Sequence, residues 1–342
     1  SRNRSSRINS LKVELTTGLI LLVIYNQGTR VQFPILERSG FCRVVLLFYY
    51  FVFRKVHYLS NTTMLSALLF IPIIGSLILL PMSEESSTGV TRMKQIALIT
   101  SMVNFILSIV LWGEFDSSAV QYQFVQEFNS LSFCHFNLGI DGISLYFVLL
   151  TTLITPICIL SNWDNIKFGM KYFLIAFLLM ETLLIAVFVV LDLMLFYIFF
   201  EAVLIPMFLV VGIWGGSATR IRASFLLFLY TLAGSLFMLL AIMVIYYNVG
   251  STDFAVVSLS DFSLGGQKIL WLAFFLSFAV KTPLVPFHMW LPRAHAEAPL
   301  AGSILLAGLF LKLATYGYLR ILIGFMPDAT SYFSPLVQTI AI

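Results

Sequence analysis

The stretch 269-ILWLAFFLSFAVKTPLVPFHMWLP-292 decides the fold, because it places a lysine deep inside an apolar run. About twelve apolar residues precede Lys281, and two prolines follow it within the segment Lys281–Pro286. Proline has no backbone N–H, so we expect a helix broken here, with the carbonyls of Ala279 and Thr282 freed. A charge at the bilayer centre costs about 2.5–3.5 kcal/mol and usually marks a path for ions or protons. The alternative is a lysine that reaches the interface from a helix end.

The composition predicts an integral membrane protein. Only 11% of the 342 residues are charged, against about 25% in soluble domains. Apolar runs long enough to cross a bilayer predict an all-α, polytopic helix bundle with spans at 64–82, 95–113, 140–161, 172–191, 193–214, 223–247, 269–291 and 299–323. A ninth run starts near Phe333 and is cut at Ile342, which indicates a piece of a longer protein. No basic block suggests nucleic-acid binding.

The charges between the spans alternate in sign, which supports this number of spans. Lysines and arginines lie in the loops after the first, third and fifth spans, and Arg293 and His295 follow the seventh. The loops between these contain mainly acidic residues, such as Asp253 and Asp261. By the positive-inside rule, the basic loops face the cytoplasm or the mitochondrial matrix.

Residues 1–63 do not fit this pattern, whereas residues 64–342 form the predicted membrane domain. The first segment is rich in arginine, and its apolar patches at 15–25 and 44–53 are too short to cross a bilayer comfortably. It contains no recognisable cleavable signal peptide. One interpretation is a targeting or accessory arm; the other, which we favour, is an extension that precedes a true start at Met64.

Three further charged residues lie within apolar spans. Glu181 and Glu201 are each near mid-span, where a carboxylate needs a partner or water. Lys312 is followed at i+3 and i+4 by Thr315 and Tyr316, so we expect this face to point into the bundle. A glutamate favours the charged form of a buried lysine, so a Lys–Glu pair whose separation changes can act as a proton gate. The alternatives are neutral structural acids and a structural salt bridge between helices.

Other polar residues suggest more ordinary roles. His288, His295 and Glu297 follow the predicted break; histidine titrates near neutral pH, so a proton relay is favoured over a metal site, with interfacial hydrogen bonding as the alternative for His288. We expect Asp141, close to a span end, to cap a helix. The three widely spaced cysteines indicate apolar packing rather than a disulfide or zinc site. With no strand pattern, dinucleotide motif or cysteine cluster, no cofactor is expected on this chain.

The stretch 279-AVKTPLVPFHMWLPRAHAEAPLAGSILLAGLFLKLATYGYLR-320 closely resembles the antiporter-like, proton-pumping membrane subunits of respiratory complex I. The stretches 138-LGIDGISLYFVLLTT-152 and 196-FYIFFEAVLIPMFLVVGIWG-215 resemble the subunit 4 branch of that family in particular. The resemblance covers residues 64–342. Subunits 2 and 5 and the Mrp-type cation/proton antiporters share the lysines but differ in the sequence around them.

The resemblance implies a bundle of about fourteen transmembrane helices with two inverted repeats, of which this chain holds the first. It implies that Glu201 and Lys281 are the coupling pair of the first half-channel and that Lys312 is the central lysine on the proton axis. It places His288 and His295 in a hydrated polar chain and Glu181 at a neighbouring acidic position.

The resulting hypothesis is a proton-translocating membrane subunit of NADH:ubiquinone oxidoreductase in the mitochondrial inner membrane. Its partners would be neighbouring antiporter-like subunits of complex I and the lipid bilayer. NADH, FMN, iron–sulfur clusters and ubiquinone would belong to the partner subunits. The alternatives are an Mrp-type cation/proton antiporter subunit and a structural membrane spacer whose buried charges only fix helix packing.

Overall fold

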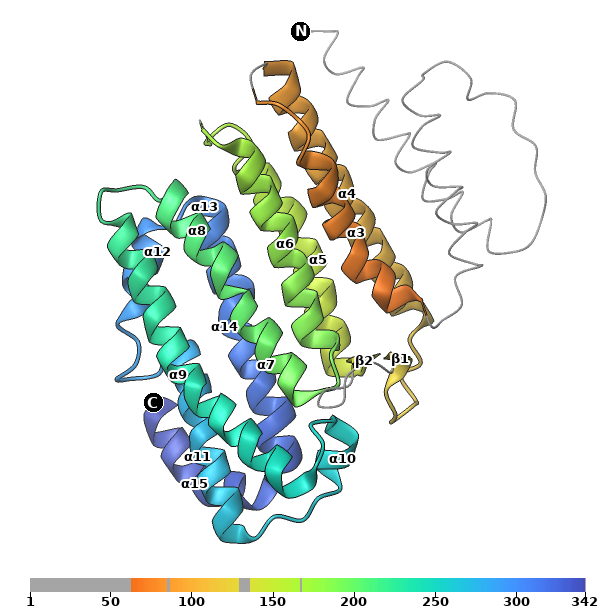
Figure 1. The fold of residues 1–342 in the computed structure, drawn as a ribbon, viewed down its shortest axis with the longest axis vertical. Coiled ribbons are helices and arrows are strands. Elements are labelled where there is room, and N and C mark those ends of the chain that lie inside the picture. The colour runs from red at the N-terminus through yellow and green to blue at the C-terminus, as the bar shows by residue number, and fades with distance from the viewer. Residues whose placement is uncertain (1–62, 85–86, 129–135, 167, 342) are drawn as a thin grey trace, which may run out of the picture. The chain divides into compact units, whose positions relative to one another are not determined.

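In a computed structural model, residues 63–84, 87–128, 136–166 and 168–341 are described, and all of them belong to one unit, residues 59–342. The proposed extension over residues 1–63 lies, except for Thr63, outside the described residues. The described chain is a helix bundle (Figure 1). Its helical segments are α3 (Met64–Leu79), α4 (Ser87–Glu114), α5 (Gly142–Ser161), α6 (Met170–Val189), α7 (Leu193–Ala202), α8 (Leu204–Trp214), α9 (Arg220–Val249), α10 (Phe254–Ser258), α11 (Leu264–Lys281), α12 (Trp290–Glu297), α13 (Leu300–Leu305), the π-helix η1 (Leu306–Phe310), α14 (Leu311–Gly317), the π-helix η2 (Tyr318–Ile323) and α15 (Pro327–Ala341).

The predicted spans correspond to these helices. Within the described residues, seven segments are long and apolar enough to cross a membrane, and two of them join several elements: Leu193–Trp214 and Leu300–Ile323. The first predicted span forms the shorter, 16-residue helix α3. The span predicted at 269–291 instead begins at Leu264 and ends at Lys281, and the ninth begins at Pro327 rather than near Phe333.

The centre of the bundle is α6, whose side chains are mostly buried. It packs between α3, α4 and α5 on one side and α7 and α8 on the other. Small residues allow other helices to approach closely, as is usual where lipid replaces water. A Cβ built on Gly234 of α9 would lie 2.8 Å from the Cβ of Val280, and one on Gly317 would lie 2.6 Å from the ring of Phe278. Any larger side chain would separate these helices.

The loops lie at the two ends of the bundle in the predicted alternation. The connections α3–α4, α5–α6, α8–α9 and α12–α13 gather at one end, which is the basic end, and α6–α7 and α9–α11 at the other (Figure 1).

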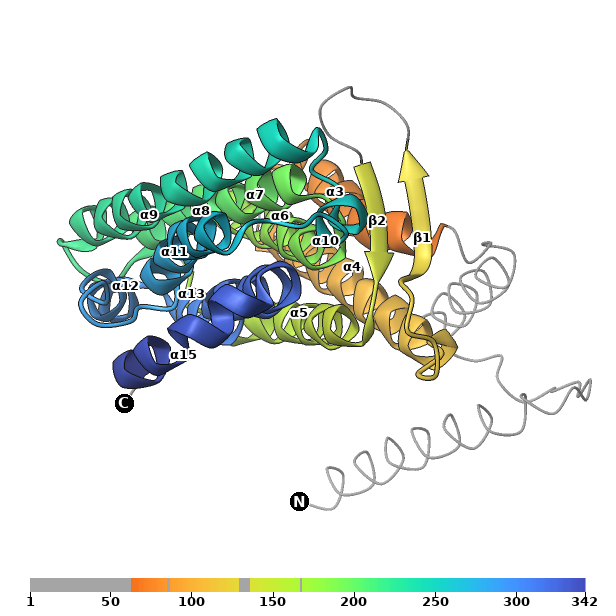
Figure 2. The ribbon, with the colours of Figure 1, turned by 90° about the horizontal axis from the view of Figure 1, so that it is seen from below.

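A β-hairpin that the sequence analysis missed lies at the acidic end. It consists of β1 (Gln123–Phe128) and β2 (Phe136–Ile140), antiparallel with Gln126 opposite Leu138 (Figure 2). The hairpin is tied to the bundle by the N–H of Leu191, which donates to the carbonyl of Asn137 at 2.9 Å. The expectation of no strand is therefore wrong; these strands are short and stabilised by long-range pairing.

Candidate functional site

Lys281 lies at the end of α11 and is buried, with 1% of its surface exposed. Its Nζ donates to the carbonyl oxygen of Phe200 at 2.7 Å. The same atom lies 3.3 Å from the ring centroid of Phe200 and 4.9 Å from that of Phe310. The preceding residue, Val280, packs against Gly234, halfway along the 30-residue helix α9. Lys281 is therefore near mid-span, as predicted, and does not reach an interface.

The helix breaks after Lys281 as the two prolines predict, but its last carbonyls find donors. The N–H of Leu284 donates to Ala279 at 2.9 Å, so the expectation that this carbonyl is free is wrong. The indole Nε1 of Trp290 donates to the carbonyl of Val280 at 2.8 Å. Unpaired carbonyls inside a membrane are costly, and these two bonds therefore stabilise the broken helix.

Glu201 lies at a second helix interruption, near the end of α7 and two residues before the turn at Val203. Its two carboxylate oxygens are buried and have no hydrogen-bond partner within the described part of the chain. Ser235 lies beside it, and the charges of Glu201 and Lys281 act on one another. The structure thus brings the two predicted residues into one site without an ion pair between them among the described residues.

Glu181 is buried on α6 and is paired with an amide rather than with a lysine. Nδ2 of Asn104 on α4 donates to its Oε1 at 2.7 Å. Oε2 of Glu181 and Oδ1 of Asn104 have no partner within the described ranges. Asn104 was not predicted as part of a site, although a polar residue in the middle of an apolar span was a visible signal.

Lys312 is exposed on the described part of this chain, and its predicted orientation into a bundle stays a prediction. Its Nζ donates to the carbonyl of Ala307 at 3.2 Å. Ala307 lies in η1, where π-helical winding opens the backbone ladder five residues before the lysine. The predicted role of Lys312 in proton transfer remains a prediction.

The two histidines after the break are both half-buried but do not form a metal site. Nδ1 of His288 has no partner in the described structure, and burial lowers the pKa of His295 below its usual value. The carboxylate of Glu297 accepts from the N–H of Ser217 and the hydroxyl of Thr219 instead. In the described residues, no three metal-binding side chains of the His, Cys, Asp and Glu types converge.

A partly buried ion pair at the acidic end was not predicted. Nη2 of Arg320 lies 2.8 Å from Oδ1 of Asp141, and this guanidinium also donates to Ser144, Tyr316 and Tyr122. Asp141 caps α5, as predicted, by accepting from the N–H of Ser144 at 2.9 Å. Burial alone would raise the pKa of Asp141, but the bonds and charge of Arg320 outweigh it and hold the pKa below its usual value.

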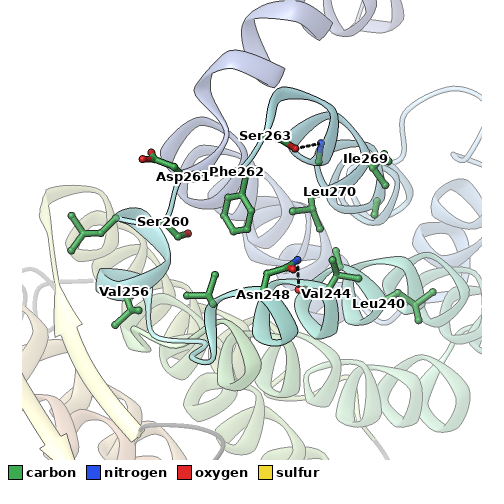
Figure 3. A pocket seen from close by; sticks show the side chains of 15 residues that line it. Leu240, Val244, Asn248, Val256, Ser260, Asp261, Phe262, Ser263, Ile269 and Leu270 are labelled. Atoms are coloured by element: carbon green, nitrogen blue, oxygen red, sulfur yellow. Dashed lines mark hydrogen bonds between the residues drawn. The ribbon is translucent and has the colours of Figure 1, made fainter.

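A hollow of about 710 Å³ lies away from the buried charges, between α9 and α11. Figure 3 shows Phe262 and Leu270 turned toward it and Asp261 turned outward. Neither Glu201 nor Lys281 lines it. Cys158 is buried and free, as predicted, whereas Cys42 and Cys134 lie outside the described residues.

Comparison with known proteins shows what the chain is similar to. The chain is 74% identical over 279 residues to NADH-ubiquinone oxidoreductase chain 4 of Mycosarcoma maydis, a match that covers 82% of this chain and 58% of that protein. Most of its length therefore resembles chain 4 of NADH-ubiquinone oxidoreductase. The Arabidopsis thaliana chain 4 is 50% identical over 279 residues, covering 81% of this chain and 56% of its own length. The chain thus spans a little under three fifths of these relatives. Its similarity to these relatives and the seven spans make it a multi-pass protein of the mitochondrial inner membrane.

Two further findings agree with the similarity to chain 4. Residues 190–342 match the family described as NADH:quinone oxidoreductase/Mrp antiporter, transmembrane region. A chain of respiratory complex I from Thermus thermophilus superposes with a TM-score of 0.70 at 27% identity, covering 82% of this chain and 56% of that one. A chain of an archaeal membrane-bound sulfane sulfur reductase shares the fold, with a TM-score of 0.63 at 21% identity over 77% of this chain and 40% of that one.

Proposed function

We propose that this chain translocates protons as a membrane subunit of NADH:ubiquinone oxidoreductase. The observation that carries the proposal is the placement of Lys281 and Glu201 in one site near mid-span, each beside a break in its helix. Discontinuous helices of this kind build ion sites in membrane transporters. An ionisable residue inside the membrane that forms no salt bridge costs free energy, and such residues usually mark a path for ions or protons.

The proposed step is a change in the distance between these two charges. When Glu201 approaches, its carboxylate favours the protonated amine of Lys281; when it withdraws, burial favours release of a proton from Nζ. In the described conformation the lysine is held by the carbonyl of Phe200, apart from Glu201. In the proposed cycle, this conformation would be the state in which the two charges are separated.

We infer that water connects this pair to the other candidate residues. Buried polar atoms without a protein partner are ordinarily bonded to water. Such atoms belong to Glu181, Glu201, Ser277 and His288. They supply a polar route through the bundle, with His288 and His295 as relay groups and Glu181 as a further acid. Lys312, exposed on the far side of η1, would pass protons onward to a region beyond this chain.

We infer that the redox chemistry belongs to partner subunits. NADH, FMN, iron–sulfur clusters and ubiquinone are expected there, and this chain would contribute to the enzyme as its proton-translocating part. The expected partners are neighbouring antiporter-like subunits of complex I. Support comes from the relatives' names and from the complex I chain that shares the fold.

The proposal is tested by NADH-driven proton pumping in membranes carrying Lys281→Ala, Glu201→Gln or both. Residues that act as a unit lose function non-additively, so each single variant should lose nearly as much pumping as the double variant. Assembly is checked on a native gel. Lys268→Ala is the matched control, because Lys268 lies on the same helix over the ring of Tyr332, at 3.4 Å. Normal pumping by assembled Lys281→Ala would refute the proposal.

A second candidate is an Mrp-type cation/proton antiporter subunit, since the matched family includes those proteins. It predicts sodium-dependent proton movement in the absence of NADH. A structural spacer instead predicts that apolar residues at both Lys281 and Glu201 leave pumping intact.

A further inference from the structure

Two phenylalanine rings surround the ammonium group of Lys281. The ring of Phe200 lies 3.3 Å and the ring of Phe310 4.9 Å from Nζ, measured to the ring centroids. They come from different elements, α7 and η1, and are 1% and 2% exposed. A cation over an aromatic face is attracted by the negative face of the ring, most strongly where water is excluded.

These contacts satisfy a charged lysine without Glu201. An ammonium group has three N–H donors; the carbonyl of Phe200 accepts one at 2.7 Å, and the two ring faces lie within cation–π range of the rest. The carboxylate of Glu201, on the next residue of the same helix, has Ser235 beside it and makes no ion pair with the lysine in the described structure. The ammonium group of Lys281 therefore has two alternative sets of partners. One is the aromatic cage, formed by the rings of Phe200 and Phe310 with the carbonyl of Phe200; the other is the carboxylate of Glu201.

The ring of Phe310 in this aromatic cage is itself positioned by a neighbouring side chain. The indole of Trp290 packs edge-on against the ring of Phe310, with centroids 6.3 Å apart, and its N–H donates to the carbonyl of Val280. Trp290 is fully buried. One side chain thus positions both the ring over the ammonium and the backbone just before Lys281.

We propose that Phe200 and Phe310 are positioning residues that hold Lys281, while it is still protonated, apart from Glu201 in the separated state that precedes release of the proton from Nζ, and so set how readily the pair closes. This rests on the proposed function and adds to it the group that holds the lysine while the pair is open. Lys312 lies two residues beyond Phe310. A movement of Lys281 out of the cage therefore changes contacts on the segment that carries Lys312.

The test is Phe310→Leu in the assembled complex, with proton translocation per NADH oxidised and the rate of NADH oxidation measured together. The proton pumping rate should fall by about tenfold, the factor that corresponds to about 1.4 kcal/mol. Phe310→Tyr keeps the aromatic face and should restore pumping to within about twofold of the wild type. Phe173→Leu removes an equally buried ring on α6, against Phe177 and Trp214, and is the control for lost packing.

The outcomes separate this inference from the proposed function. If Lys281→Ala abolishes pumping but Phe310→Leu pumps like Phe173→Leu, the aromatic cage is wrong and the proposed function stands. If Lys281→Ala pumps normally, both fail. If Phe310→Leu does not assemble, Phe310→Met, whose flexible unbranched side chain fills irregular gaps, replaces it, and unchanged pumping there equally overturns the cage.

Discussion

Replacing Arg320 by Met should loosen the acidic end of the bundle measurably. Methionine is uncharged and keeps much of the apolar length of the arginine, so the change removes mainly the guanidinium. It leaves the carboxylate of Asp141 without its ion pair at 2.8 Å and the hydroxyls of Tyr122 and Ser144 without their donor. Removing one partner of a buried pair costs about 3–5 kcal/mol. Because Asp141 is 25% exposed, we expect the lower end, about 3 kcal/mol.

Labelling of Cys158 provides the assay. This thiol is buried on α5, the helix that Asp141 caps, so it reacts only after local opening. A loss of about 3 kcal/mol should speed its labelling in the purified complex by about a hundredfold. Arg320→Lys keeps the charge but loses the planar fork, and should fall between wild type and Arg320→Met. The control is Arg222→Met, which removes an exposed arginine at the start of α9.

The pH dependence of this labelling gives a second check. The pKa of Asp141 in the folded protein is held below its usual value. The ion pair therefore contributes its full stabilisation above about pH 4, and this stabilisation is lost as the pH falls further and the carboxylate is protonated. The difference between wild type and Arg320→Met should therefore be the same at pH 7 and pH 5. A labelling rate in Arg320→Met equal to that of Arg222→Met would refute the reasoning.

Two further predictions concern packing and the buried acid. Gly317→Ala should lower the amount of assembled complex on a native gel, because the added Cβ would lie 2.6 Å from a phenylalanine ring on α11. Such overpacking costs about 1–3 kcal/mol. The control Gly113→Ala, with no atom within 4 Å of its Cβ, should assemble normally. Glu181→Gln keeps an oxygen for the Nδ2 of Asn104, so assembly should persist while the pumping rate falls, and normal pumping would exclude Glu181 from the relay.

Much of the fold follows from local sequence signals. Apolar runs place the spans, and the prolines beside Lys281 end α11 where predicted, since a missing backbone donor acts wherever the helix goes. The cap at Asp141 is similarly local, because its partner is the N–H of Ser144 three residues on. These features depend on residues within a turn or two of one another.

Other features depend on contacts that one stretch of sequence does not contain. The π-helical winding just before and just after α14 is one, since the spacing around Lys312 was judged from a regular α-helix. The pairing of Asn104 with Glu181 joins residues 77 positions apart, and Arg320 meets Asp141 across the bundle. The aromatic cage also depends on long-range packing, because Phe200 and Phe310 lie on different helices and come together at the ammonium group of Lys281.

Proton translocation per NADH oxidised, measured with the purified complex carrying Lys281→Ala in sealed proteoliposomes beside Lys268→Ala, tests the central claim most directly. If the pair of Lys281 and Glu201 carries protons, Lys281→Ala assembles but loses pumping, whereas Lys268→Ala pumps as the unmodified complex does. Equal and undiminished pumping by the two variants would contradict the claim and leave the buried lysine with a structural role.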